Sequence, residues 1–171
     1  MTLTTAQINE LLGIKESYKA SDRLMEILFD SKEKRESLFK AFLEIEPNLD
    51  YDWFHVYFQD EHADRKLKKQ DFTPRGITDL LVGLAGASDT YFEATAGTGG
   101  IVIQHWWQSP FCYYCVEELS DRAFPFLLFN LAIRNINGTA YHGDSLTQEW
   151  ENVYELTIGE QFSDITRRGA L

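Results

Sequence analysis

The alternation of strand-like and helix-like segments between residues 89 and 142 is the feature that most constrains the fold. Short aromatic-rich runs alternate with segments whose apolar residues recur at helical spacing. Strands are expected over residues 89–94, 111–116 and 138–142, and helices over residues 98–107 and 121–135. Because strand–helix–strand units connect parallel neighbours, this order predicts an α/β fold with a mostly parallel sheet flanked by helices.

The first third of the chain predicts a helical extension in front of the α/β region. The expected N-caps of its helices are Thr5, Ser21 and Ser31, and the first and third helices are expected to end at Gly13 and Pro47. An aromatic-rich run over residues 51–58, which contains Trp53, is expected to be a further helix packed on the core. The chain thus divides into a helical region, residues 1–69, and an α/β region, residues 70–171, within one compact unit.

The segment after residue 70 and the last part of the chain complete the predicted secondary structure. Thr73 and Pro74 are expected to be the N-cap and the first residue of a helix that ends near Gly86. The expected apolar face of this helix consists of Ile77, Leu80, Leu81 and Leu84. One more strand is expected over residues 153–158, and the polar stretch 160–171 is expected to be loose.

The charge of the chain narrows the classes of partner. Its 171 residues carry a formal net charge of −11, so unaided DNA binding is not expected, because phosphate contacts rely on Lys and Arg. The short basic run over residues 65–69 is typical of a solvated loop. The start of the chain has no signal-peptide pattern and no apolar run is long enough to span a bilayer. We therefore expect a cytoplasmic protein without membrane contact.

The two cysteines, Cys112 and Cys115, are expected to be buried or half-buried free thiols. Their spacing matches a redox motif, but redox pairs normally open a helix and this pair lies in a strand-like run. A redox or metal-binding role is the alternative, although no second cysteine pair is present to complete a zinc site. His142 is expected to be a strand-end residue rather than a base, and no metal site is predicted.

Candidate binding groups follow each of the three predicted parallel strands, and ligands of such sheets sit at the carboxyl ends of the strands. The groups are Glu93 with the loop Ala96–Gly100, the pair Glu117 and Glu118, and the stretch Gly143–Ser145. Glycines let a backbone approach a ligand closely, and a strand-end carboxylate can accept hydrogen bonds from a ribose. Each group alone is also explained by a tight turn or a solvated side chain. Together they predict a site for an adenosine-containing ligand.

Several ordered motifs between residues 72 and 146 support this interpretation. They are Phe72-Thr73-Pro74, Glu93-Ala94-Thr95-Ala96-Gly97-Thr98-Gly99-Gly100, Glu118-Leu119, Asn130-Leu131 and Gly143-Asp144-Ser145-Leu146. In these motifs the chain resembles the N6-adenine DNA methyltransferases, in particular the modification subunits of type I restriction systems and their phage-borne relatives. The resemblance implies a partial Rossmann-like methyltransferase fold that binds S-adenosylmethionine (SAM).

The resemblance also implies a role for each matching residue. The residues implied at the methionine end of SAM are Phe72, Thr73 and Pro74, with the loop beneath it formed by Glu93, Ala96, Gly97, Thr98 and Gly99. The residues implied around the adenosine are Glu118 and Leu119 at the ribose, with Glu117 as the alternative to Glu118, and Asp144, Ser145 and Leu146 at the adenine.

Two departures from the family pattern bear on activity. Glu93 and Ala94 stand where the family has Asp and Pro, which lengthens the acid by one methylene and loosens the turn. The family's Asn/Asp-Pro-Pro-aromatic motif, which grips a flipped adenine, is absent, because no two prolines of the chain are adjacent. The four prolines are Pro47, Pro74, Pro110 and Pro125. The catalytic residues therefore stay unassigned.

Three functions fit these observations. The chain is an active adenine methyltransferase completed by a partner chain, a SAM-binding but non-catalytic subunit or regulator, or an acidic protein that interferes with restriction by imitating a modification subunit. We favour a SAM-binding, methyltransferase-like protein of a restriction–modification or phage context. Its expected ligands are SAM and S-adenosylhomocysteine, DNA is expected only where a partner supplies recognition, and self-association stays open.

Overall fold

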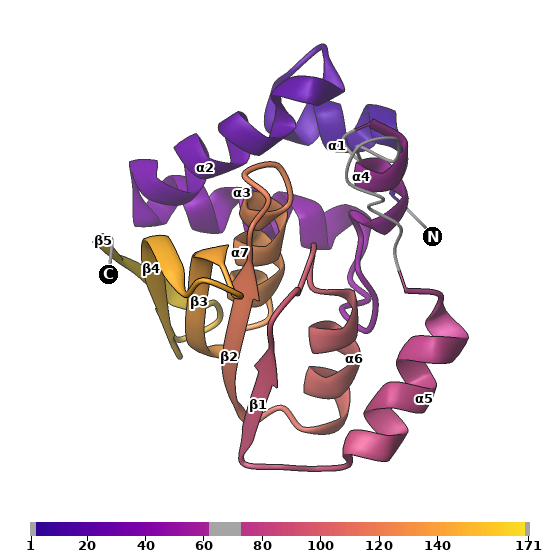
Figure 1. Ribbon diagram of the computed structural model, residues 1–171. Helices are drawn as coiled ribbons and strands as arrows, with labels where there is room; N and C mark the ends of the chain where they lie inside the picture. Colours follow the sequence, from indigo (N-terminus) through magenta and orange to yellow (C-terminus); the bar gives the residue numbers. More distant parts are fainter. Residues whose placement is uncertain (1–2, 62–72, 170–171) are drawn as a thin grey trace.

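The predicted alternation forms the first three strands of one open sheet. The computed structural model describes residues 3–61 and 73–169, where five strands lie in the order β1-β2-β3-β4-β5 (Figure 1). The parallel strands are β1 (Thr90–Glu93), β2 (Tyr113–Glu118) and β3 (Asn137–Asp144), and they are connected by α6 (Gly100–Gln108) and α7 (Phe124–Ile133). The α/β class and the parallel order of these three strands are confirmed.

The sheet is mixed rather than mostly parallel, because its last two strands run antiparallel. The strand expected over residues 153–158 is longer, since β4 (Glu149–Thr157) follows β3 after a short turn and pairs back onto it. The tail, expected to be loose, contains β5 (Asp164–Gly169), which pairs with β4. Ser163 fixes the start of β5, since its N–H and hydroxyl donate to carbonyl oxygens of α7 and of the loop after it, at 2.9 and 2.7 Å.

The helical extension packs on the sheet region through α7. Its elements are α1 (Thr5–Leu12), a 3-10 turn (Ser17–Lys19), α2 (Ala20–Asp30), α3 (Lys32–Ile45) and α4 (His55–Glu61). In Figure 1, α1 to α3 cross the top of the molecule over α7, and α2 contacts α7 directly. Residues from both regions contribute to one continuous hydrophobic core.

Two of the predicted helix starts are wrong. The N-cap of α1 is Thr4 rather than Thr5, because Thr4 exchanges hydrogen bonds with Gln7 in a capping box. Ser21 caps no helix, since α2 continues directly from the 3-10 turn. Its hydroxyl instead donates to the carbonyl oxygen of Arg122 at 2.8 Å, which joins α2 to the turn before α7.

Other boundaries agree with the sequence more closely. Gly13 ends α1 in the left-handed conformation with a φ of 67°, and the Ser31 hydroxyl accepts a hydrogen bond from the first turn of α3. α3 ends at Ile45, two residues before Pro47. The helix expected over residues 51–58 begins only at His55, because the residues before it form turns.

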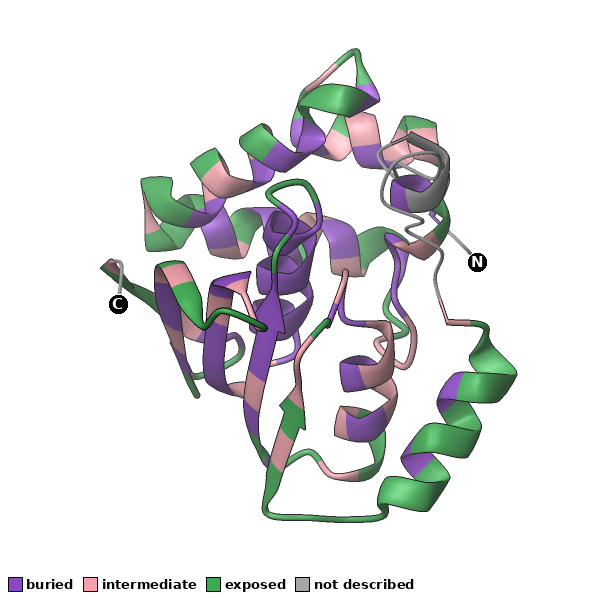
Figure 2. Cartoon of the chain, viewed as in Figure 1, coloured by how far each residue is buried: buried purple, intermediate pink, exposed green. Residues whose placement is uncertain are grey.

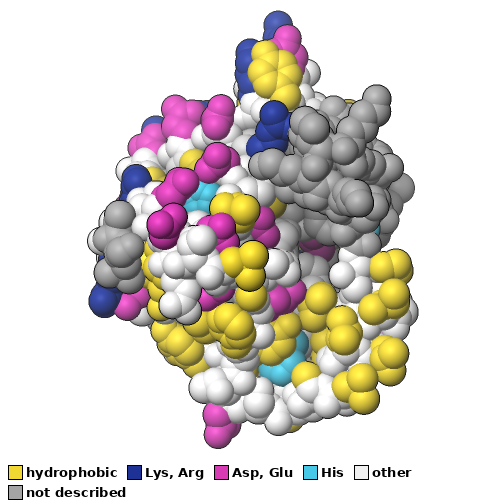
Figure 3. Space-filling model, viewed as in Figure 1, with side chains coloured by type: hydrophobic (Ala, Val, Ile, Leu, Met, Phe, Trp, Pro, Cys, Tyr) yellow, Lys and Arg dark blue, Asp and Glu magenta, His cyan; other side chains and the backbone are white. Residues whose placement is uncertain are grey.

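The apolar stripe of α5 (Arg75–Ala85) faces outward, which the sequence did not predict. The N-cap is Pro74, so Thr73 lies one residue outside the helix, and Gly86 ends it as expected. α5 packs on α6 by its other side, where Thr78 and Val82 are buried. The residues of the expected apolar face are 43–75% exposed and gather over α5 in Figure 3; they are Ile77, Leu80, Leu81 and Leu84. Helical spacing identified the stripe but not the direction in which it points.

Cys112 is buried and Cys115 is half-buried, and both thiols are free, as predicted. Within residues 3–61 and 73–169, no helix combines the length and apolar character needed to cross a bilayer. The basic run over residues 65–69 lies outside the described residues.

The centre of the core is α7, all of whose ten residues are buried (Figure 2). The Phe129 ring meets the rings of three aromatic residues from the helical extension, with centroids 4.9–5.1 Å apart; they are Phe39, Phe42 and Phe54. Trp53 is also buried, as predicted, and stacks on Phe42. Aromatic packing on α7 therefore holds the helical extension to the sheet.

We expect Phe129→Ala to lower the free energy of unfolding by about 3–5 kcal/mol, because it leaves a cavity among three rings. Urea unfolding followed by circular dichroism measures this change. Phe111→Ala is the matched control, since the Phe111 side chain is 95% exposed and should change stability by less than about 0.5 kcal/mol. Equal effects of the two substitutions would contradict the central role of α7.

Candidate functional site

A cleft of about 600 Å³ lies at the carboxyl ends of β1, β2 and β3. Most of the residues singled out from the sequence line it: Thr73, Glu93, Ala96, Gly97, Glu118, Leu119, Asp144, Ser145 and Leu146. The helical extension adds His55 and Phe58 to the wall, which the sequence did not predict. The cleft is therefore the place where the predicted strand-end groups converge.

Three of the predicted residues that the structure describes do not line the cleft. Pro74 lines a smaller neighbouring pocket of about 310 Å³ rather than the cleft itself. Thr98 belongs to the glycine loop but is fully buried, and Gly99 is the N-cap of α6; neither lines the cleft. Phe72 lies outside the described residues.

The loop between β1 and α6 needs its glycines for backbone reasons. Gly97 and Gly99 have φ values of 59° and 97°, in the region that residues with a Cβ rarely adopt. The Gly99 N–H donates to the Ala96 carbonyl oxygen at 2.8 Å, and the Ala96 N–H donates to the carbonyl oxygen of Glu117 at 2.9 Å. The loop is therefore a tight turn fastened to the end of β2, and it places backbone and small side chains against the cleft.

Glu118 holds the glycine loop in place. One carboxylate oxygen accepts a hydrogen bond from the Gly97 N–H at 2.7 Å, and the other accepts one from the Ser120 N–H at 2.7 Å. Each oxygen keeps a second lone pair, so the carboxylate can still accept a hydrogen bond from a ligand hydroxyl. Of the two candidate carboxylates, Glu118 lines the cleft and Glu117 does not.

Glu93 is a carboxyl group with an altered protonation equilibrium. Its pKa is raised from 4.5 to about 7, mainly because the group is buried; a hydrogen bond from the Tyr91 hydroxyl at 2.9 Å acts to lower the pKa, and the nearby negative charge of Glu118 acts to raise it. Near neutral pH this group therefore exchanges between a neutral donor and an anionic acceptor within the cleft. A cationic ligand group beside it would favour the anion.

The last residue of β3 and the turn after it also line the cleft. The Asp144 carboxylate accepts a hydrogen bond from the Leu146 N–H at 2.8 Å, which is ordinary turn chemistry. The Ser145 hydroxyl donates to the Ala94 carbonyl oxygen at 2.6 Å and so joins this turn to the loop after β1. The Leu146 side chain is 94% exposed at the rim.

A buried polar network behind the glycine loop was not predicted from the sequence. The Asp52 carboxylate accepts hydrogen bonds from the Thr98 hydroxyl at 2.5 Å and from the Asn130 side-chain amide at 2.8 Å. The Arg134 guanidinium donates to the Asn130 side-chain oxygen at 2.8 Å and to the Tyr51 carbonyl oxygen at 2.7 Å. The network ties the helical extension to the loop that lines the cleft. The one hint of this network in the sequence is Asp52, an acidic residue within the aromatic-rich run over residues 51–58.

We expect Glu93→Gln to stabilise the folded chain more at about pH 8 than at about pH 5. The carboxyl group ionises near pH 4.5 in the unfolded chain but near pH 7 in the folded chain. Its contribution to the free energy of unfolding therefore falls by up to about 3 kcal/mol as pH rises from 4.5, and it levels off above pH 7. Glutamine does not ionise, so the variant does not lose this stability. Urea unfolding at the two pH values measures the difference. The control is Glu149→Gln, at an exposed residue of β4; its effect on the free energy of unfolding should be the same at both pH values.

The strand-end groups thus form one cleft with a glycine loop, a bracing carboxylate and a buried carboxyl group of raised pKa. These features come from separate strands, and the sheet register brings them together. Compared with known proteins, the chain matches no protein-family model, no curated protein and no solved structure.

Proposed function

We propose that the cleft binds S-adenosylmethionine, on a sheet that corresponds to part of a Rossmann-like methyltransferase domain. The observation that carries the proposal is the convergence of the glycine loop, Glu118 and the Asp144 turn on one cleft. Its volume of about 600 Å³ suits a ligand of this size, since small-molecule pockets span roughly 300–1,000 Å³. The chemistry of the lining favours an adenosine ligand with a cationic end.

Each end of the ligand has a matching group in the proposed complex. The second lone pairs of the Glu118 carboxylate accept hydrogen bonds from the ribose hydroxyls, and the Asp144 carboxylate accepts one from the adenine amine. The methionine end lies over the glycine loop, where ionised Glu93 offsets its positive charge. Leu119 and Leu146 supply apolar surface at the rim.

The proposed function is cofactor binding rather than complete methyl transfer to DNA. No Asn/Asp-Pro-Pro-aromatic motif occurs in the 171 residues, and the net charge of −11 opposes DNA contact. Methylation of adenine would then need a partner that supplies base recognition, and the adenine amine would attack the SAM methyl group directly, without a covalent enzyme intermediate. We place the chain as a subunit or regulator in a restriction–modification or phage context.

The acidity of the chain favours a second candidate function. A chain with a net charge of −11 can present carboxylates to a protein that normally holds DNA phosphates. In this alternative the chain binds another protein and so interferes with restriction, and the cleft binds no cofactor. The absence of SAM binding would favour this alternative.

We expect isothermal titration calorimetry to show micromolar binding of SAM and of S-adenosylhomocysteine to the wild-type chain. Asp144→Asn should weaken both at least tenfold, because an amide is a poorer acceptor than a carboxylate for the adenine amine. Glu149→Gln is the matched control, since Glu149 pairs with Asp144 across β3 and β4 and is exposed, and it should bind like the wild type. No heat at millimolar ligand would rule out the cofactor assignment for the chain.

The affinity for SAM should rise roughly fivefold to tenfold between about pH 6 and pH 7.5. Below its pKa of about 7, Glu93 is protonated and must lose a proton to offset the ligand's positive charge, so binding strengthens as pH rises and levels off above 7. Titrations across this range measure the trend, and Glu93→Gln should flatten it. A pH dependence that survives in Glu93→Gln would assign the titration to another group.

A further inference from the structure

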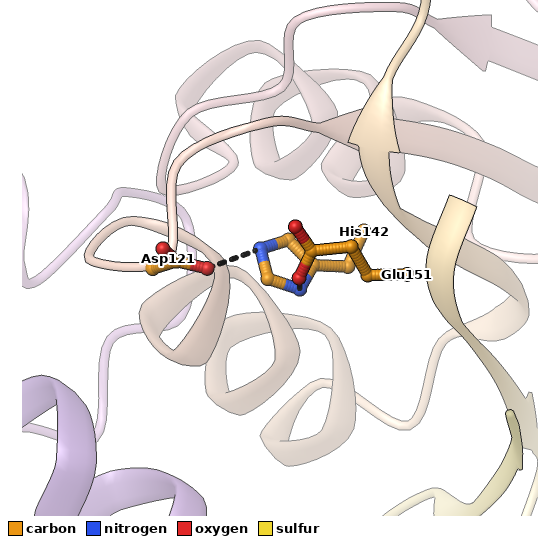
Figure 4. Close-up of side chains that lie close together, drawn as sticks. All are labelled: Asp121, His142 and Glu151. Carbon is orange, nitrogen blue, oxygen red and sulfur yellow. Dashed lines mark ion pairs between the residues drawn. The ribbon is translucent and has the colours of Figure 1, made fainter. Parts of the chain in front are cut away.

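Three side chains that could bind a metal ion meet outside the lining of the cleft, at the end of β3. His142 comes from β3, Glu151 from β4, and Asp121 from the turn before α7 (Figure 4). One ligand atom from each lies within 4.8 Å of the other two. We propose that these residues form a binding site for one zinc-like transition-metal dication, with water completing the coordination.

His142 is held ready to be a ligand. The residue is only 8% exposed, and its ring stacks on Phe124 with centroids 4.5 Å apart, which fixes the orientation of the ring. Its buried Nε2 has no hydrogen-bond partner among the described residues, although it points toward Asp121. A buried polar atom without a hydrogen bond is costly, and a bound metal ion would satisfy it.

The distances suit coordination with small movements. Nε2 of His142 lies 3.2 Å from a carboxylate oxygen of Asp121. Two ligands of a tetrahedral zinc ion, each bonded at about 2.0–2.2 Å, lie about 3.3–3.5 Å apart, so an ion fits between these atoms almost without displacement. A carboxylate oxygen of Glu151 lies 3.9 Å from the other ring nitrogen, and its exposed side chain can swing toward the ion.

The chemistry of the three side chains is better explained by a bound transition metal than by ion pairs among the side chains alone. Asp121 and Glu151 are 84% and 68% exposed at their side chains, and exposed ion pairs contribute little to stability. One imidazole nitrogen with two carboxylate oxygens suits Zn²⁺, Co²⁺ or Mn²⁺ rather than Ca²⁺ or Mg²⁺, which prefer oxygen alone. The negative charge of the chain attracts any cation, so selectivity must come from the imidazole.

A bound ion would act as a cross-link within the fold. It would join β3 and β4 to the turn that starts α7, and the buried helix α7 carries the core. His142 also pairs in register with Glu118 across β2 and β3, so the cross-link would secure the strand that ends at the cleft. The expected role of the ion is therefore structural.

The test uses untagged full-length chain freed of metal with a chelator. Calorimetric titration with Zn²⁺ should show one ion per chain, and Co²⁺ should give the visible absorption bands of a low-symmetry site with one imidazole. At about a hundredfold excess of Zn²⁺ over the dissociation constant, the melting temperature should rise by roughly 5 °C or more.

Variants decide whether these residues are the ligands. His142→Gln and Asp121→Asn should each weaken Zn²⁺ binding at least tenfold and remove the Co²⁺ bands. Asp121→Asn is the safer variant for folding, because the Asp121 side chain is largely exposed. Glu160→Gln, which removes one charge from an exposed residue in the turn before β5, should bind like the wild type. Equal binding by all three variants, or no saturable binding by the wild type, would overturn the proposal.

Discussion

Arg134 is a buried guanidinium at the end of α7. The groups that stabilise its positive charge come from several segments of the chain and so connect them. Burial lowers its pKa to about 10, while the negative charge of Asp52 acts to raise it. Between the two charges lies Asn130, which accepts from Arg134 and donates both to Asp52 and to the Thr98 carbonyl oxygen. Loss of Asp52 would remove the negative charge that acts most strongly on the buried Arg134 guanidinium, which is far more costly than loss of an exposed ion pair. The glycine loop, α7 and the helical extension therefore depend on one another.

Sequence periodicity predicted those parts of the fold that depend on local pattern. The three parallel strands and their two helices follow from alternation over short stretches. β5 was missed because an edge strand with polar residues has no apolar face that distinguishes it from a loop. The direction of α5 was missed because a single apolar stripe does not reveal whether a neighbour covers it.

The candidate site was predictable where its residues follow strand ends, and not where distant segments meet. Glu93, the glycine loop and Glu118 each sit beside a recognisable strand. In contrast, Asp52 meets Thr98 across 46 positions of the sequence, and the meeting of Asp121 with His142 depends on how α7 packs on the sheet. Such contacts come from tertiary packing, which one sequence without its structure does not specify.

The small buried face of α5 has a consequence for the stability of one wall of the cleft. The helix rests on α6 with little buried surface, yet its Thr78 belongs to the cleft wall. Elements with few buried apolar contacts open at a small free-energy cost, well below that of global unfolding. Local opening of α5 would therefore displace Thr78 and widen the cleft on that side, while the glycine loop and the sheet stay folded.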